Sequence, residues 1–398
     1  MAARPAVWLD CDPGHDDAVA LLLALFAPFS SSLSSPLSSN RNPALQVLGV
    51  SSVHGNSSGN RTFINAVRLL SAYKIDASQC KVWRGADVPL LRQAKADVAI
   101  HGEDGLGGVE CLPDIDGKDD YVHRHLLSNL KSTKSKDALK IPLASPLLLM
   151  NHLFKMLQLR LDQGLPPISI IATGPLTNIA LMIKLCPGSD LQLLEQTIDK
   201  IVIMGGAAGV PGNRSPLAEW NILVDPEAAS IVFDSPLPVV MAGLNITHQA
   251  IFTVESHRRL LLTRIQTDSG QSIEELHRHA SPIRRLISSA LTFFASTYDS
   301  EFGFDQGPPV HDMLAVAYVL DPTLFYSKGT NGSHQPPKRY AVKVDTSKGF
   351  ADGATIVDFH NQWGTPNDSW QAGGRNALVL EHVDVRVLMF KSWSQDVI

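Results

Sequence analysis

Short runs of apolar, largely β-branched residues recur along the chain. Each run is followed by a turn rich in Gly or Asn, and then by a segment with the apolar spacing of a helix. Such runs are VWLDCDPG (7–14), LQVLGVSSVHGN (45–56), ISIIATGPLTN (168–178), KIVIMGGAAG (200–209) and PVVMAGLNITHQ (238–249). Repeated strand–turn–helix units predict an α/β protein, a three-layer sandwich whose mostly parallel central sheet is covered by helices on both faces. Ligands of such sheets bind at the carboxyl ends of the strands, which is where the polar residues of this chain cluster.

Two stretches interrupt this pattern. Residues 28–44 are rich in Ser, Pro and Asn, and residues 113–140 are heavily charged. Strand–helix units resume on either side, so we interpret both stretches as surface insertions in a single domain spanning residues 1–398. Residues 339–359 alternate between apolar and polar positions, as in an antiparallel hairpin.

The composition of the chain argues against several classes of binding partner. The 398 residues carry a formal net charge of -5 and contain no run of Lys or Arg, which argues against binding to nucleic acid or to an anionic membrane. The four cysteines form no C-x-x-C pair, so neither a zinc site nor a disulfide framework is indicated. No apolar stretch approaches the ~20 residues of a membrane span, and the N-terminus enters a strand without room for a signal peptide. We therefore expect a cytoplasmic protein.

The first strand-to-helix turn gathers four carboxylates. Asp10, Asp12, Asp16 and Asp17 fall within eight consecutive positions, residues 10–17. An Asp at a helix start can be an ordinary cap, which would account for one or two of them. Two carboxylates ~5 Å apart repel by roughly 3 kcal/mol at an effective dielectric constant of ~20, so protons or a cation must relieve the full set. Proton sharing suits acid proteases and glycosidases, whose two acids come from distant segments; a hard, oxygen-preferring cation fits this turn better.

The turn also carries a recognisable motif. The residues Asp10-Cys11-Asp12-Pro13-Gly14-His15-Asp16-Asp17 resemble the N-terminal signature of the inosine–uridine-preferring nucleoside hydrolases, eukaryotic uridine and ribonucleoside hydrolases among them. Further segments similar to those of the family follow in order: VHGN (53–56), IHGEDGLGG (100–108), GPLTNIA (174–180), MGGAAGVPGN (204–213), AEWNILVDPEAA (218–229) and PPVHDMLAVAYVLDP (308–322). Seven short motifs in the same order make a chance match implausible.

The resemblance implies hydrolysis of the N-glycosidic bond of ribonucleosides such as uridine or inosine, giving free base and ribose. It also implies a Ca²⁺ ion held by Asp12, Asp17, the main-chain carbonyl of Thr177 and Asp312. Ca²⁺ accepts six to eight oxygen ligands flexibly, so it can hold protein, water and sugar diol together. Asp12 would be the general base for the calcium-held water, a role typically worth ~10²–10⁴ in rate, and Asp10 would brace the group.

The same resemblance assigns the sugar contacts. The implied ribose-binding residues are Asp16, Asp17 and Asn56 at the 2'- and 3'-hydroxyls, Asn221 at the 3'-hydroxyl, Asn213 and Glu219 at the 5'-hydroxyl, and Met204 under the ring. Cleavage builds positive charge on the ribose, and an anionic pocket stabilises that transition state more than the ground state.

Departure of the base needs a proton donor. His101 and His311 are the candidates, because imidazole titrates near neutral pH and because these two residues lie in family-like motifs. Tyr298 precedes His311 in an aromatic segment, and we expect it at the site. Phe293 and Phe294 fit either a lid over the base or a helix face in the core, and Trp220 is expected to pack in the core.

Two other functions remain open on the sequence. A haloacid-dehalogenase-type phosphatase also carries D-x-D after its first strand, but usually has Thr or Val where this chain has Gly14, and it needs no late V-H-D. A calcium-dependent protein could instead bind nucleosides without turnover. The resemblance further implies a homodimer or homotetramer and a role in purine or pyrimidine salvage. The sequence does not indicate which nucleobase the protein prefers.

Overall fold

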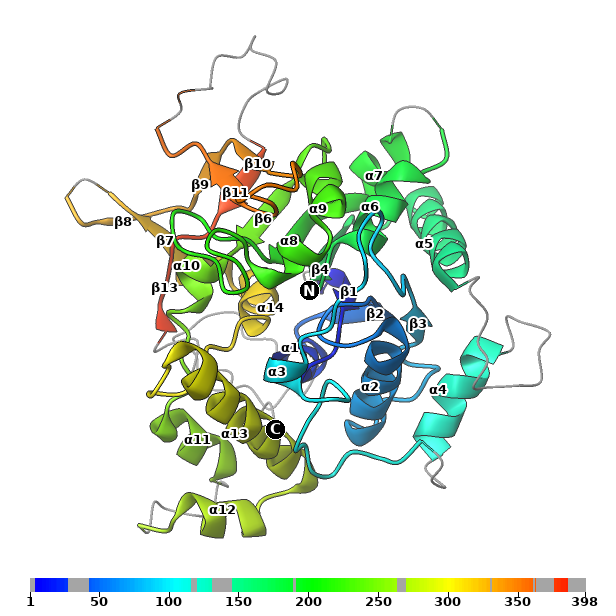
Figure 1. Cartoon of the computed structure of the whole chain (residues 1–398). Helices are drawn as coiled ribbons and strands as arrows, with labels where there is room; N and C mark the ends of the chain where they lie inside the picture. Colours follow the sequence, from blue (N-terminus) through cyan, green and yellow to red (C-terminus); the bar gives the residue numbers. More distant parts are fainter. Residues whose placement is uncertain are drawn as a thin grey trace.

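The structure, a computed structural model, describes residues 4–27, 43–115, 120–130, 145–188, 191–262, 270–329, 331–360, 362 and 376–385. In this part of the chain, the central sheet has eight strands in the order β3-β2-β1-β4-β5-β6-β12-β9. Figure 1 shows β1, β2 and β4 in the middle of the molecule, with helices around them. The strands are β1 (Ala6–Cys11), β2 (Gln46–Ser52), β3 (Val82–Arg84), β4 (Ile168–Ala172), β5 (Ile198–Met204), β6 (Val239–Ala242), β9 (Lys338–Tyr340) and β12 (Ala377–Val379). Neighbouring strands pair in parallel except β9, which pairs antiparallel with β12.

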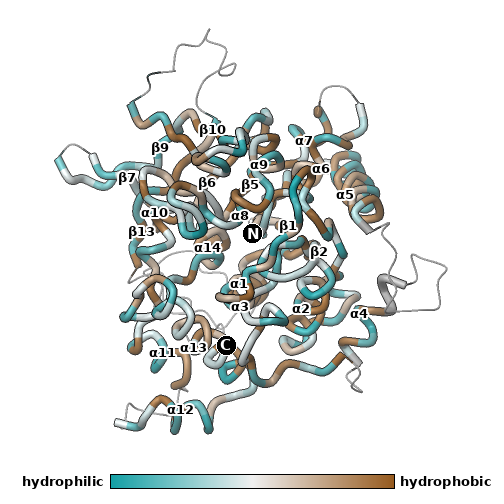
Figure 2. The backbone as a smooth tube through the Cα atoms, viewed as in Figure 1, coloured by the Kyte–Doolittle hydropathy of each residue, from teal (hydrophilic) through white to brown (hydrophobic). Residues whose placement is uncertain are grey.

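Helices cover both faces of the sheet, which confirms the predicted three-layer α/β architecture. Successive residues of β1 divide between two buried clusters: Val7 and Leu9 pack in one, whereas Trp8 packs in the other. The first face packs against α1 (His15–Phe26), α2 (Gly59–Ala72), α10 (Leu244–Thr247), α11 (Val254–Leu261), α13 (Pro282–Phe302) and α14 (Met313–Leu320). The second packs against α5 (Ser145–Asp162), α6 (Thr177–Lys184), α7 (Gln192–Thr197) and α9 (Pro226–Phe233). Figure 2 shows the resulting contrast between hydrophobic β5, α5 and α6 and the largely hydrophilic loops.

The C-terminal third differs in part from the expected single hairpin. Strands β10 (Val342–Val344) and β11 (Thr355–Val357) pair antiparallel, as the alternation in 339–359 predicts. The start of that segment belongs instead to β9, at the edge of the main sheet. A small sheet combines β7 (Phe325–Lys328), β8 (His334–Gln335) and β13 (His382–Val383), preceded by the 3-10 helix η1 (Pro322–Leu324). The remaining short helices are α3 (Val98–His101), α8 (Trp220–Val224) and α12 (Ile273–His279).

The two predicted insertions are described only in part. Of residues 28–44, all but 43 and 44 lie outside the described residues. Of residues 113–140, residues 120–130 form α4 (Asp120–Leu130), whose Val122 is buried in the core and whose His125 Nε2 lies 2.9 Å from the carbonyl oxygen of Ile75. Among the described residues, no helix combines the length and apolar character needed to cross a membrane.

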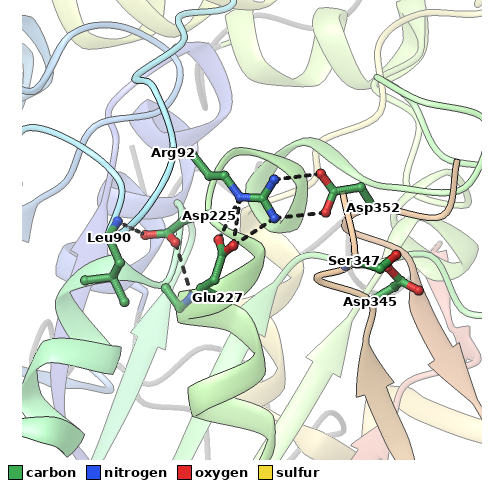
Figure 3. Close-up of polar contacts among 8 residues, drawn as sticks. Leu90, Arg92, Asp225, Glu227, Asp345, Ser347 and Asp352 are labelled. Carbon is green, nitrogen blue, oxygen red and sulfur yellow. Dashed lines mark hydrogen bonds and ion pairs between the residues drawn. The ribbon is translucent and has the colours of Figure 1, made fainter. Parts of the chain in front are cut away.

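A cluster of ion pairs fastens the loop between β3 and α3 (Figure 3). The Arg92 guanidinium donates hydrogen bonds to Glu227 of α9 at 2.8–2.9 Å and to Asp352, in the turn between β10 and β11, at 2.9–3.0 Å. Two residues earlier, the Leu90 amide donates to Asp225 Oδ2 at 3.0 Å. The contacts of Arg92 therefore join three segments that are far apart in sequence. Arg92 itself lies shortly before the segment that carries His101.

Candidate active site

A single pocket contains most of the residues singled out in the sequence. It opens where β1, β2, β4 and β5 end, as expected for a ligand site in a parallel sheet. Its lining comprises Asp16, Asn56, Asp97, Ile100, His101, Thr173, Met204, Asn213, Arg214, Glu219, Trp220, Asn221, Phe294, Tyr298, Phe302, His311 and Asp312. Asp12 and Asp17 are completely buried behind this lining.

The acidic turn receives a further carboxylate from a distant segment. Asp16 and Asp17 lie in the first turn of α1, and Asp312 precedes α14. Oxygen atoms of these three residues all lie within 4.8 Å of one another. The three carboxylates predicted as metal ligands are Asp12, Asp17 and Asp312. The three that lie within this distance of one another therefore include Asp16 in place of Asp12.

Asp12 has one carboxylate oxygen engaged and one without a partner. Its Oδ2 accepts a hydrogen bond from the Asn56 amide at 2.7 Å, whereas its buried Oδ1 has no hydrogen-bond partner among the described residues. Two glycines make room for this carboxylate, because a Cβ on Gly55 would lie 2.1 Å from Oδ2 and one on Gly174 would lie 2.6 Å from Oδ1. An unpartnered buried oxygen is costly, so Asp12 is poised for an outside donor or cation.

Asp10 and Asp17 are held by neighbouring strands and loops. Asp17 accepts from the Gly14 amide at 2.9 Å and from Thr173 Oγ1 at 2.8 Å. Asp10 accepts hydrogen bonds from Ser51 and, at 2.8 Å, from Asn178 Nδ2. It therefore lies behind the turn, consistent with a bracing role.

The carboxylates of the acidic turn and Asp312 have no positively charged partner among the described residues. Burial, followed by the charge of Asp17, raises the pKa of Asp12 well above its ordinary value and that of Asp16 to about 8. Burial and then Asp16 raise the pKa of Asp312. No Lys or Arg of the described chain forms an ion pair with this group. Hard carboxylate oxygens, burial and mutual repulsion together fit a divalent cation such as Ca²⁺.

Thr177, the predicted carbonyl ligand, begins α6 as the chain leaves β4. Its hydroxyl donates to Asp225 Oδ2 at 2.6 Å and lies 2.9 Å from His54 Nε2. These side-chain contacts fix the first turn of α6.

The predicted ribose contacts other than Asp17 line the pocket. Asn221 Nδ2 donates to the carbonyl oxygens of Thr173 and Met204 at 2.8 and 3.1 Å, and Met204 lies buried at the end of β5. Glu219 caps α8 by accepting from the Asn221 and Ile222 amides, and burial raises its pKa to about 7. Asn213 also lines the pocket, where its Oδ1 accepts from the Trp220 amide at 3.0 Å.

The two candidate proton donors differ in their partners. His311 has both ring nitrogens engaged, with Nε2 2.7 Å from the Tyr298 hydroxyl and Nδ1 2.8 Å from Thr247 Oγ1. The Nδ1 of His101 lies 3.2 Å from Nδ1 of His15. Among the described residues, no group hydrogen-bonds to Nε2 of His101, and the residue lines the pocket. Burial lowers the pKa of both histidines, which makes each imidazolium a rarer but stronger acid.

Several lining residues escape sequence reasoning. Trp220, expected in the core, lines the pocket and is only partly buried, because α8 begins at the pocket edge. Phe294 is both core and lining, since α13 presents it beside Tyr298. Arg214 forms ion pairs with Asp97 and, at 3.8 Å, with Glu301. The motif MGGAAGVPGN (204–213) places the neighbouring Arg214 near the site, but nothing in the sequence indicates its pairing with Asp97 and Glu301.

Sequence comparisons agree with this geometry. The family model for inosine-uridine preferring nucleoside hydrolases matches residues 7–389. The pyrimidine-specific ribonucleoside hydrolase RihA of Shewanella sp. (strain ANA-3) is 33% identical over 383 residues, covering 96% of this chain and 92% of that protein. RihA of Escherichia coli (strain K12) is 33% identical over 355 residues, covering 89% and 88%.

Solved structures share the fold. A purine-preferring ribonucleoside hydrolase from Gardnerella vaginalis superposes with a TM-score of 0.68 at 24% identity, covering 98% of each chain. The plant nucleoside hydrolase PpNRh1 gives a TM-score of 0.69 at 24% identity over 99% of each chain. The family match decides against both a haloacid-dehalogenase-type phosphatase and a protein that only binds nucleosides. The chain belongs to the inosine-uridine preferring nucleoside hydrolase family and is an enzyme that hydrolyses the N-glycosidic bond of ribonucleosides.

Proposed function

We propose that the enzyme is a calcium-dependent hydrolase that prefers pyrimidine ribonucleosides, with Asp12 as general base. The observation that carries this proposal is the buried group of Asp12, Asp16, Asp17 and Asp312, which has no cation of its own in the described chain. A charged group of this kind needs a cation to remain ionised at neutral pH.

Calcium would be held by Asp12, Asp17, Asp312 and the Thr177 carbonyl, with Asp16 close enough to share the site. When bound, it would orient the attacking water and the 2',3'-diol and lower the pKa of the water. Asp12 would take the proton of that water at Oδ1, the oxygen that has no hydrogen-bond partner in the described part of the chain. The Asn56 amide on Oδ2 keeps the carboxylate oriented during this transfer.

The sugar is gripped by amide and carboxylate groups. Asn56, Asn221 and Asp16 supply partners for the 2'- and 3'-hydroxyls, and Glu219 with Asn213 supplies partners for the 5'-hydroxyl. The carboxylates face the positive charge that develops on the ribose as the bond breaks, so they lower the barrier.

His101 is the better candidate for protonating the leaving base. Its Nε2 has no hydrogen-bond partner among the residues that the structure describes, whereas both nitrogens of His311 are engaged by Tyr298 and Thr247. The paired Tyr298 and His311 would then contact the base and orient it.

The pyrimidine preference is inferred from RihA, which is named pyrimidine-specific and is 33% identical to this chain. We further propose that the enzyme is a cytoplasmic homodimer or homotetramer that acts in nucleoside salvage and has no nucleic-acid or membrane partner.

A nucleoside panel assayed for free base and ribose tests the proposal. Uridine and cytidine should be cleaved faster than inosine, and a calcium chelator should abolish turnover until calcium is restored. Full activity with the chelator would contradict the proposed calcium dependence, and faster cleavage of inosine would contradict the proposed pyrimidine preference.

A further inference from the structure

His15 lies in the middle of the acidic turn, yet it is neither a proposed metal ligand nor a pocket residue. Its side chain is completely buried. The ring lies nearly parallel to those of His101 and Phe293, with interplanar angles of 19° and 13° and centroids 5.4 and 5.0 Å away. The ring nitrogens are both engaged, with Nε2 2.9 Å from the Gly107 carbonyl oxygen and Nδ1 3.2 Å from His101 Nδ1.

These two contacts determine where the protons lie. A carbonyl oxygen can only accept, so Nε2 of His15 must be the donor to Gly107. The ring is completely buried, and its nitrogens contact only a carbonyl oxygen and another imidazole, so an imidazolium would have no counter-charge in contact with it among the described residues. The ring is therefore neutral, and its Nδ1 carries no proton. That nitrogen can therefore only accept, and the proton between the two rings must belong to Nδ1 of His101.

We infer that His15 is a positioning residue for base departure: through Gly107 it fixes His101 in the Nδ1–H tautomer, with Nε2 directed to the pocket. This inference rests on the proposed role of His101 as proton donor to the base. With Nδ1–H committed to His15, Nε2 is the ring nitrogen that takes up a proton from solvent, giving the imidazolium, and then transfers it to the departing base. The other tautomer would place a hydrogen on Nε2 and leave two lone pairs facing each other between the histidines.

The packing leaves His101 little freedom to turn. A Cβ on Gly14 would lie 2.5 Å from His101 Nδ1, and a Cβ on Gly107 would lie 2.8 Å from the Phe293 ring. Glycine at these two positions allows the close packing of these rings, and that packing orients both histidines.

Two variants separate the hydrogen bond from the packing. His15→Phe keeps an aromatic ring between His101 and Phe293 but removes both hydrogen bonds. His15→Gln retains one donor and one acceptor and should restore part of the rate. His101→Ala measures the whole contribution of the proton donor.

The substrates are uridine and 4-nitrophenyl riboside, whose nitrophenolate departs without protonation. On uridine, His15→Phe should lower kcat by about 10- to 100-fold, which is part of the ~10²–10⁴ expected for a general acid, and His101→Ala should lower it at least as much. On nitrophenyl riboside, both variants should stay within about threefold of the parent enzyme. In a His101→Ala background, His15→Phe should have no further effect on uridine.

Each outcome is decisive. Equal losses on both substrates, with weaker calcium binding by calorimetry, would make His15 a structural support of the acidic turn and overturn the inference. A loss with His101→Ala but none with His15→Phe would overturn it while leaving the proposed acid intact. No loss with His101→Ala would overturn both. Nitrogen NMR of histidine-labelled enzyme should show His101 protonated at Nδ1, and protonation at Nε2 would contradict the inference.

Discussion

The molecule gathers carboxylates in two places and treats them differently. Glu227 and Asp352 converge on the Arg92 guanidinium, a cation that the chain itself supplies (Figure 3). Asp16, Asp17 and Asp312 converge on one another, with Asp12 behind them and no Lys or Arg among them in the described chain. The first arrangement fastens a loop, and the second is complete only with a cation from solution. Carboxylates that are paired with an arginine stabilise the fold, whereas carboxylates without such a partner are available for ligand binding and catalysis.

The largest effect is expected from removing a carboxylate of the turn. Asp12→Ala or Asp312→Ala should lower kcat by about 10³-fold or more, because each change removes a proposed base or metal ligand. Asp312→Ala should also weaken calcium binding. Steady-state hydrolysis of uridine measures the first effect.

Asp352→Ala is the matched control. It removes a carboxylate from the cluster that has its own cation, so the activity should stay within a few-fold of the parent enzyme. Near-normal turnover in either variant of the acidic turn would remove the assignment of that residue.

The next prediction concerns pH. Burial raises the pKa of Asp16 to about 8, from an ordinary value of 3.8. Without metal, the folded state therefore binds a proton that the unfolded state releases. This contribution to stability is fully present below about pH 4 and is lost as pH rises through about 8. Calcium displaces the proton, so its affinity should increase with pH over the same window.

Melting temperatures with calcium and with chelator measure this dependence. The increase caused by calcium should be small near about pH 5.5 and larger near about pH 8. Taking the difference cancels the titration of groups outside the site. A calcium effect that is independent of pH would show that the carboxylates are already ionised in the free enzyme.

The smallest effect is expected at the neutralised cluster. Arg92→Met should lower the free energy of unfolding by about 1–2 kcal/mol, because Glu227 and Asp352 lose their partner but remain partly exposed, at 16% and 22%. Chemical denaturation measures the change.

The control is Arg61→Met, which breaks an exposed pair with Glu103 at 4.0 Å and should be nearly neutral. Calcium affinity should not change in either variant. A large loss of calcium binding in Arg92→Met would show that the two carboxylate groups are not independent.

The sequence predicts what is local. Apolar runs separated by Gly- and Asn-rich turns indicate β1, β2, β4, β5 and β6, and strand ends indicate where Asp12 and Asn56 lie. It does not reveal β12, because Ala377–Val379 joins the sheet beside β6 only through tertiary pairing. His15 escapes for the same reason: its role depends on Gly107, 92 positions away, and on a ring stacked from α13. Partners of Arg92 and Arg214 are likewise set by packing rather than by spacing.

Calcium titration of the metal-free enzyme by calorimetry, in buffers of different ionisation enthalpy, tests the central claim most directly. The account predicts one ion bound per chain, with release of protons near neutral pH, and loss of binding in Asp312→Ala but not in Asp352→Ala. Absence of calcium binding, or equal binding in Asp312→Ala, would contradict it.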